Sequence, residues 1–170
     1  PFSRGLFESY KKISRAIGFA LEKIGISFSY ALRKDRNPAL DAGSPKNASC
    51  FQSLSFGEIS VGGRKIVGSA QRRWPEGLLQ QGSIPFSINH DETVRIFGIS
   101  SDATAVQTAA GLKDFLPDLA SHQFKRSLIE SFEETFCVHF AVSSPARHEI
   151  VHAEESMTRK YMSCEWNFGR

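Results

Sequence analysis

The stretch Gly62-Gly63-Arg64-Lys65-Ile66-Val67-Gly68-Ser69-Ala70-Gln71 decides how the middle of the chain folds. A Gly-Gly pair between two runs of strand-forming residues predicts a tight turn, with one strand from Gly57 to Val61 and another from Lys65 to Gln71. A third strand is predicted over about 78–86. The small residues 68–70 leave room for a ligand chain against the backbone of their strand. The stretch therefore predicts a β-hairpin that presents a basic pair and a flat, small-residue surface.

Helices are predicted on both sides of this hairpin. Apolar residues recur with helical spacing from Leu6 to Ile24, Ser3 is a suitable N-cap, and Gly25 is a natural stop. The other predicted elements are a strand over 26–30, a long polar loop over 33–49, short helices within 89–119, a helix over 124–136, a strand over 137–142 and a helix after Ser144-Pro145. Mixed helices and strands of this kind predict one α+β (mixed α/β) domain over residues 1–170.

Composition narrows the class of protein. The chain has 170 residues, 41% hydrophobic and 23% charged, with a formal net charge of +3, which is ordinary for a folded protein. No apolar run approaches the roughly 20 residues that span a bilayer, and the first residues do not resemble a signal peptide. No basic face alternates with stacking aromatics, so nucleic acid is not expected as a partner. Three cysteines without a CxxC pair favour a reducing cytoplasm over a disulfide framework.

Two side chains in this region suggest nucleophilic chemistry. Cys50 closes the long loop, and Lys65 follows the Gly-Gly turn. A thiol near an ammonium ionises more readily, and the thiolate is the nucleophilic form. Spacing alone leaves a structural interpretation open, because a lysine after such a turn is usually solvated and a lone cysteine is usually a small core residue.

A family resemblance adds to this pattern. The chain resembles the octanoyltransferase branch of the biotin/lipoate protein ligase family in four places: Cys50-Phe51, the strand 63–71, the strand Leu79-Gln80-Gln81-Gly82-Ser83-Ile84, and the ending Lys160-Tyr161 with Glu165-Trp166-Asn167-Phe168. The resemblance implies the class II synthetase-like fold of that family, a mostly antiparallel sheet flanked by helices. Relatives usually begin with strands that carry an Arg-Arg-x-x-Gly-Gly motif, which this chain lacks, so we expect the N-terminal part of the family domain to be missing.

The resemblance also implies a two-step acyl transfer. In the first step, Cys50 would attack the thioester of octanoyl acyl carrier protein and hold an octanoyl (or lipoyl) group. In the second step, a protein lysine would accept this group. The lysine would belong to a lipoyl domain of 2-oxoacid dehydrogenases or to glycine cleavage H protein. Lys65 would hydrogen-bond the acyl carbonyl oxygen. The implied substrate-binding residues are Gly63, Arg64, Gly68, Ser69, Ala70, Gln71, Gly82 and Ser83. No cofactor, metal or membrane contact is implied, and a monomer is expected.

Several other functions remain open. An ATP-dependent lipoate or biotin ligase on the same fold would share the strand that begins at Lys65, but its reaction would need no cysteine. An amidotransferase moving octanoyl between lipoyl-bearing proteins, or a non-catalytic regulatory subunit, is also compatible. The run His148-Glu149-Ile150-Val151-His152 matches the H-E-x-x-H pattern of zinc peptidases, but the third ligand and glycine of the metzincins do not follow it, so a solvated helical pair is the more common explanation.

Overall fold

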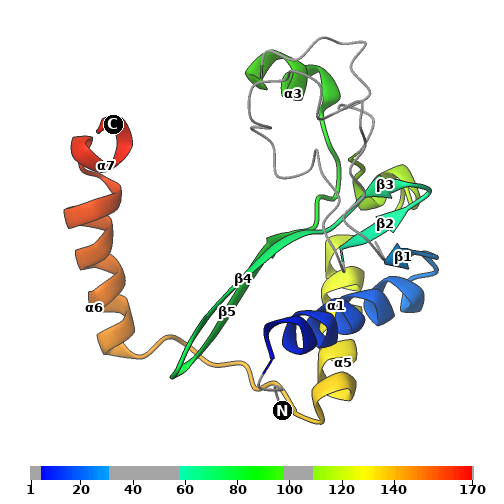
Figure 1. The fold of residues 1–170 in the computed structure, drawn as a ribbon, viewed down its shortest axis with the longest axis horizontal. Helices are drawn as coiled ribbons and strands as arrows, with labels where there is room; N and C mark the ends of the chain where they lie inside the picture. The colour runs from blue at the N-terminus through cyan, green and yellow to red at the C-terminus, as the bar shows by residue number, and fades with distance from the viewer. Residues whose placement is uncertain (1–4, 31–57, 98–108, 170) are drawn as a thin grey trace. The chain divides into compact units, whose positions relative to one another are not determined.

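The computed structural model describes residues 5–30, 58–97 and 109–169 (Figure 1). The chain divides into two compact units, Pro1–Val138 and His139–Arg170. The first unit contains the sheets, the hydrophobic core and most of the predicted site residues, whereas the second is a helical segment.

The first helix, α1 (Leu6–Lys23), follows the predicted apolar stripe. Ile13, Ile17 and Leu21 are buried on one face, as the helical spacing requires. The helix begins after Gly5, and Ser3, the predicted N-cap, lies outside the described residues. The predicted stop at Gly25 is confirmed, because this residue adopts a φ of +84° that favours glycine.

Three short strands form the first sheet, in the order β1 (Ser29–Tyr30), β2 (Ile59–Val61) and β3 (Arg64–Lys65), all antiparallel. Gly62 and Gly63 make the predicted turn with φ values of +56° and +77°, the backbone of a tight hairpin. The predicted strand 26–30 is shorter than expected, since only its last two residues pair with β2.

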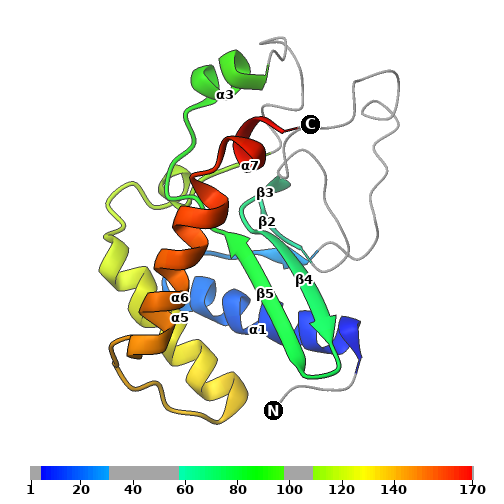
Figure 2. The same cartoon turned by 90° about the vertical axis from the view of Figure 1, so that its left-hand side faces the viewer.

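The predicted strand from Lys65 to Gln71 is divided between two sheets. Its first residue ends β3, and its second part belongs to β4 (Gly68–Trp74), which pairs with β5 (Gly77–Ser83) in a long antiparallel hairpin (Figure 2). Ile66 and Val67 between them are both buried. Successive side chains of a strand point to opposite faces, so two neighbouring buried residues suit a passage through the core better than a half-buried strand.

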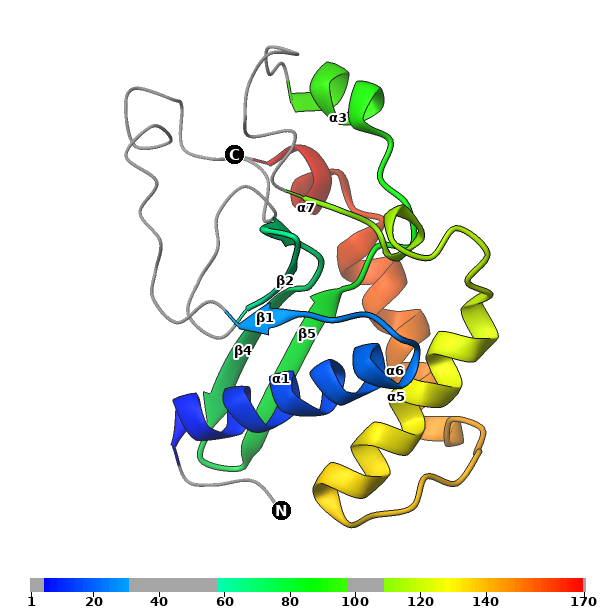
Figure 3. The ribbon, with the colours of Figure 1, turned by 90° about the vertical axis from the view of Figure 1, so that its right-hand side faces the viewer.

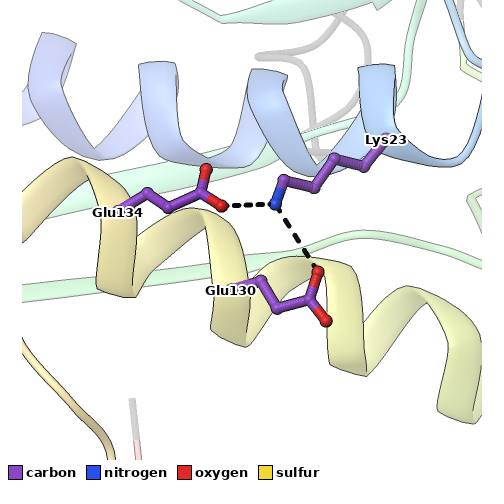
Figure 4. Close-up of polar contacts among 3 residues, drawn as sticks. All are labelled: Lys23, Glu130 and Glu134. Carbon is purple, nitrogen blue, oxygen red and sulfur yellow. Dashed lines mark hydrogen bonds and ion pairs between the residues drawn. The ribbon is translucent and has the colours of Figure 1, made fainter.

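The remaining elements of the first unit are α3 (His90–Phe97), η1 (Leu112–Asp114) and α5 (Ser121–Phe136). The predicted helix over 124–136 is confirmed as the larger part of α5, which packs along α1 (Figure 3). Phe124 and Phe136 of α5 join Leu21 of α1 in the core. The Lys23 ammonium at the end of α1 lies 2.7 Å from Glu134 and 3.5 Å from Glu130 of α5 (Figure 4). Because these side chains are exposed, solvent screens their attraction, and the apolar contacts carry the packing.

The second unit contains α6 (Arg147–Ser156), the π-helical turn η2 (Met157–Tyr161) and α7 (Cys164–Phe168). The predicted strand over 137–142 is wrong, because these residues adopt no strand. The predicted helix forms, but it begins after Ala146 instead of Ser144, since the Glu149 carboxylate accepts the Ala146 N–H at 2.6 Å. No described helix is long and apolar enough to cross a bilayer.

Candidate active site

The backbone of Lys65 is held on both sides. Lys65 pairs with Ser60 across the hairpin, and the next residue donates its N–H to the Ile59 carbonyl at 3.1 Å. On the other side, the Lys65 carbonyl accepts the Ala110 N–H at 3.0 Å. The lysine therefore starts from a fixed backbone position between two neighbouring segments. Its side chain is almost fully buried, with 3% exposure, which contradicts the solvated hairpin residue that spacing alone left open.

The buried Lys65 ammonium forms an ion pair with Glu58. Its Nζ lies 2.8 Å from Glu58 Oε2, and the two side chains are only 3% and 5% exposed. Burying either charge without compensation costs several kcal/mol, so each side chain requires a charged or polar partner. The sequence prediction missed Glu58. The available signal was a carboxylate directly before the buried strand Ile59–Val61, where an unpaired charge would be costly.

A cavity of about 320 Å³ borders Glu58, the carboxylate of this ion pair, and follows the small residues of the second sheet. Its walls are formed by Glu58, Gly68, Ser69, Ala70, Gln81, Gly82 and Ser83. Five of the predicted substrate-binding residues therefore meet at one cavity, from two strands whose register pairs Ser69 with Gly82. At position 82 a Cβ would lie 2.7 Å from the Gly68 carbonyl oxygen and 2.8 Å from Ser69 Cβ, so the two strands approach this closely only with glycine there.

The other predicted substrate-binding residues lie outside the cavity wall. Gly63 forms the hairpin turn, and Arg64 pairs with Asp114 at 3.0 Å. The Gln71 side chain accepts the Ser9 hydroxyl at 2.9 Å and donates to Gln80 at 2.9 Å. These contacts give the three residues structural roles, and their contact with substrate stays a prediction. Cys50 lies outside the described residues, so its predicted approach to Lys65 also stays a prediction.

Tyr10 of α1 supports the cavity wall from the helix side. Its hydroxyl lies 2.8 Å from the Ser69 hydroxyl. Burial raises the pKa of Tyr10, the Ser69 hydrogen bond partly opposes this change, and the negative charge of Glu58 raises the pKa further. The phenol therefore stays neutral at physiological pH and holds Ser69 in place without adding a charge to the site.

This raised pKa predicts a loss of stability at alkaline pH. Tyr10 ionises in the unfolded chain near its ordinary value of 10.0 and later in the folded protein, so its stabilisation is full below that pH and falls as the pH rises through the folded pKa. The test is urea unfolding of the wild type and of Tyr10→Phe over a series of pH values. The free energy of unfolding of the wild type relative to Tyr10→Phe should be constant below pH 10.0 and should fall above it. A difference that stays constant well above that pH would contradict this assignment.

The H-E-x-x-H run does not form a metal site with the other residues that the structure describes. Within residues 5–30, 58–97 and 109–169, no group of three or more His, Cys, Asp or Glu side chains is arranged to hold a metal ion. The Glu149 carboxylate caps the start of α6. This contact gives Glu149 a structural role at the start of α6.

Comparison of the fold with solved structures defines the class of protein. The structure matches lipoate-protein ligase A bound with ATP at a TM-score of 0.74 and 20% identity, covering 99% of this chain and 62% of the other. It matches the T. acidophilum protein Ta0514 with bound lipoic acid at the same TM-score and identity, covering 100% and 62%. A bi-partite lipoate protein ligase studied with its E2 lipoyl domain, from Thermoplasma acidophilum, matches at 0.66 and 19%, covering 99% and 60%. These similarities show the predicted α+β lipoate ligase fold.

The sequence comparison then identifies the family. The model of the lipoyl protein ligase A/B catalytic domain matches residues 3–133, and the chain belongs to this family. Octanoyltransferase LipM of Kyrpidia tusciae is 30% identical over 169 residues, which are 95% of this chain and 61% of that protein. The LipM of Geobacillus kaustophilus is 29% identical over 171 residues, 96% of this chain and 62% of that protein. The chain thus spans less than two thirds of the length of these curated relatives.

Proposed function

We propose that this chain carries the acyl-transfer site of an octanoyltransferase that acts in lipoate assembly. The observation that carries this proposal is the buried Lys65 ammonium, whose partner Glu58 lines a cavity walled by small residues. A hydrogen-bond donor beside a cavity walled by small residues suits an acyl group, with its carbonyl at the cation and its chain along the wall. The LipM relatives support octanoyl as the group that is transferred.

The proposed reaction has two balanced steps. In the first, the Cys50 thiolate attacks the carbonyl carbon of octanoyl acyl carrier protein, a new C–S bond forms, and the carrier leaves as its thiol after taking up a proton. In the second, the neutral amine of an acceptor lysine attacks the octanoyl-cysteine. An amide bond forms, the amine loses its proton, and the Cys50 thiol is regenerated. Lys65 stabilises the oxyanion in both steps, and neither step needs a cofactor because the thioester is already activated.

The proposed acceptor is a lysine of a lipoyl domain or of glycine cleavage H protein. A structural neighbour of this chain was studied together with its E2 lipoyl domain, which supports a lipoyl domain as the acceptor. A monomer working in the cytoplasm suits this reaction, because acyl carrier protein and lipoyl domains are soluble partners.

An ATP-dependent ligase is the second candidate. Its support is the fold match to lipoate-protein ligase A bound with ATP. That match is 20% identical, whereas the LipM of Kyrpidia tusciae is 30% identical over 95% of this chain. Cys50, which the ligase reaction does not need, also favours the transferase.

The test is a search for the octanoyl-cysteine intermediate. The chain is mixed with octanoyl acyl carrier protein, quenched, and analysed by mass spectrometry with and without hydroxylamine, which cleaves thioesters. We expect one hydroxylamine-sensitive octanoyl group on Cys50 in the wild type and none in Cys50→Ala; Cys137→Ala, which changes an exposed thiol at the end of α5, is the matched control and should keep the adduct.

Two outcomes would contradict the transferase. The first is a wild type without an adduct, or an adduct that persists in Cys50→Ala. The second is octanoylation of a lipoyl domain from free octanoate and ATP that survives in Cys50→Ala, which would establish the ligase instead.

A further inference from the structure

Glu58 is a buried carboxylate that the two-step reaction does not use. It lies directly before β2, is 5% exposed, and forms part of the cavity wall. Its Oε2 lies 2.8 Å from the Lys65 ammonium. A buried ion pair is weak evidence for stability, because the cost of removing two charges from water offsets most of their attraction. The pair therefore requires another explanation.

The register of the hairpin directs the two side chains toward each other. Side chains two residues apart on a strand share a face, so Glu58 shares a face with Ser60. Ser60 is the cross-strand partner of Lys65. Glu58 is thus the diagonal neighbour of Lys65, at a separation that long side chains span. The hydrogen bond from the Ala110 N–H to the Lys65 carbonyl, and that from the next residue, Ile66, to the Ile59 carbonyl, fix the starting point of its side chain.

A fixed backbone does not by itself fix the ammonium. A lysine side chain has four rotatable carbon–carbon bonds and carries a compact charge that bonds in any direction. A hydrogen-bond donor aids catalysis only if it already lies where the oxyanion will form, and a displacement of about 1 Å can cost about 10²-fold in rate. The Glu58 carboxylate, at hydrogen-bond distance, holds the end of this side chain.

We propose that Glu58, which lines the cavity, is a positioning residue that fixes the neighbouring Lys65 ammonium, so that it meets the carbonyl oxygen of the bound acyl group. This inference rests on the proposed acyl transfer. Glu58 acts through Lys65 and exchanges no proton or bond with the substrate. One carboxylate oxygen, Oε2, lies at hydrogen-bond distance from the ammonium, and a lysine ammonium has three hydrogens to donate.

The first test is the rate of octanoyl-Cys50 formation in Glu58→Gln. Glutamine has almost the same shape, so the cavity and the KM for octanoyl acyl carrier protein should change little, whereas kcat should fall about 10²-fold because the ammonium is no longer held. Glu134→Gln is the matched control: it makes the same chemical change in an exposed carboxylate that also pairs with a lysine, and its kcat should equal that of the wild type. Rates are expressed per folded molecule, as measured by circular dichroism.

A second measurement does not depend on activity. In a ¹H–¹⁵N spectrum of lysine ammonium groups, the buried Lys65 signal should be visible through slow exchange and identifiable by its loss in Lys65→Met. It should shift or broaden in Glu58→Gln and stay unchanged in Glu134→Gln. Glu58→Asp keeps the negative charge but shortens the side chain, so it should fold like the wild type while its kcat falls.

The outcomes separate this inference from the proposed function. A wild type without an octanoyl adduct would remove the function, while the Lys65 signal would still report whether Glu58 holds the ammonium. An unchanged Lys65 signal in Glu58→Gln overturns the inference. A wild-type kcat per folded molecule in Glu58→Gln also overturns the inference. The same holds for a wild-type kcat in Glu58→Asp, because the negative charge would then be sufficient wherever the carboxylate lies.

Discussion

Lys65→Met is expected to lower kcat for octanoyl transfer about 10²–10³-fold and to lower the free energy of unfolding by about 3–5 kcal/mol. The loss of transfer follows because methionine has no donor for the oxyanion, and removal of one such donor typically lowers kcat about 10²–10³-fold. The loss of stability follows because Glu58, 5% exposed, would remain buried with its main cationic partner removed. Single-turnover acylation and urea unfolding of the same preparation measure both effects.

The matched control is the double substitution Glu58→Met with Lys65→Met. Two apolar side chains of similar length fill the space of the ion pair and leave no buried charge, so stability should return to within about 1 kcal/mol of the wild type or exceed it. Acyl transfer should stay as slow as in Lys65→Met. Restored stability together with slow transfer would show that the Glu58–Lys65 ion pair serves catalysis and is not needed for folding. A double variant that is as unstable as Lys65→Met, or a single variant with wild-type activity, would contradict this account.

Ala70→Leu is expected to shorten the acyl chain that the protein accepts. Ala70 lies on the cavity wall beside Gly68 and Ser69, and a leucine there would occupy space that the chain needs. Displacing about three methylene groups at about 0.8 kcal/mol each should lower kcat/KM for octanoyl acyl carrier protein roughly fiftyfold. Transfer of a butyryl group should change little, because a short chain does not extend past the substitution.

Arg72→Leu is the control for this prediction. It introduces the same side chain on the same face of β4, two residues further on, where the strand no longer borders the cavity. Its ratio of octanoyl to butyryl transfer should match that of the wild type. Equal losses for both chain lengths in Ala70→Leu would mean that the substitution disturbs the hairpin and that the cavity does not hold the acyl chain.

Local patterns were sufficient for the elements whose signals lie within a few residues. The helical stripe of α1, the glycine at its end and the Gly62-Gly63 turn were all predicted and are present, because each follows from backbone preferences of neighbouring residues. The small residues of β4 and β5 were likewise recognised, and they line one cavity. The strand predicted over 137–142 does not form, because the periodicity of a short apolar run is too weak to specify a strand.

The sequence by itself determined the family, the position of the lysine after its turn, and the small-residue strands that leave space for a ligand. Only the tertiary structure decided that the predicted strand after Lys65 is divided between two sheets, and that Glu58 is the partner of the buried ammonium. The physical reason is distance along the chain. Periodicity and turn chemistry act between neighbours, whereas the Ala110 contact and the burial of the ion pair arise only when separate segments pack together.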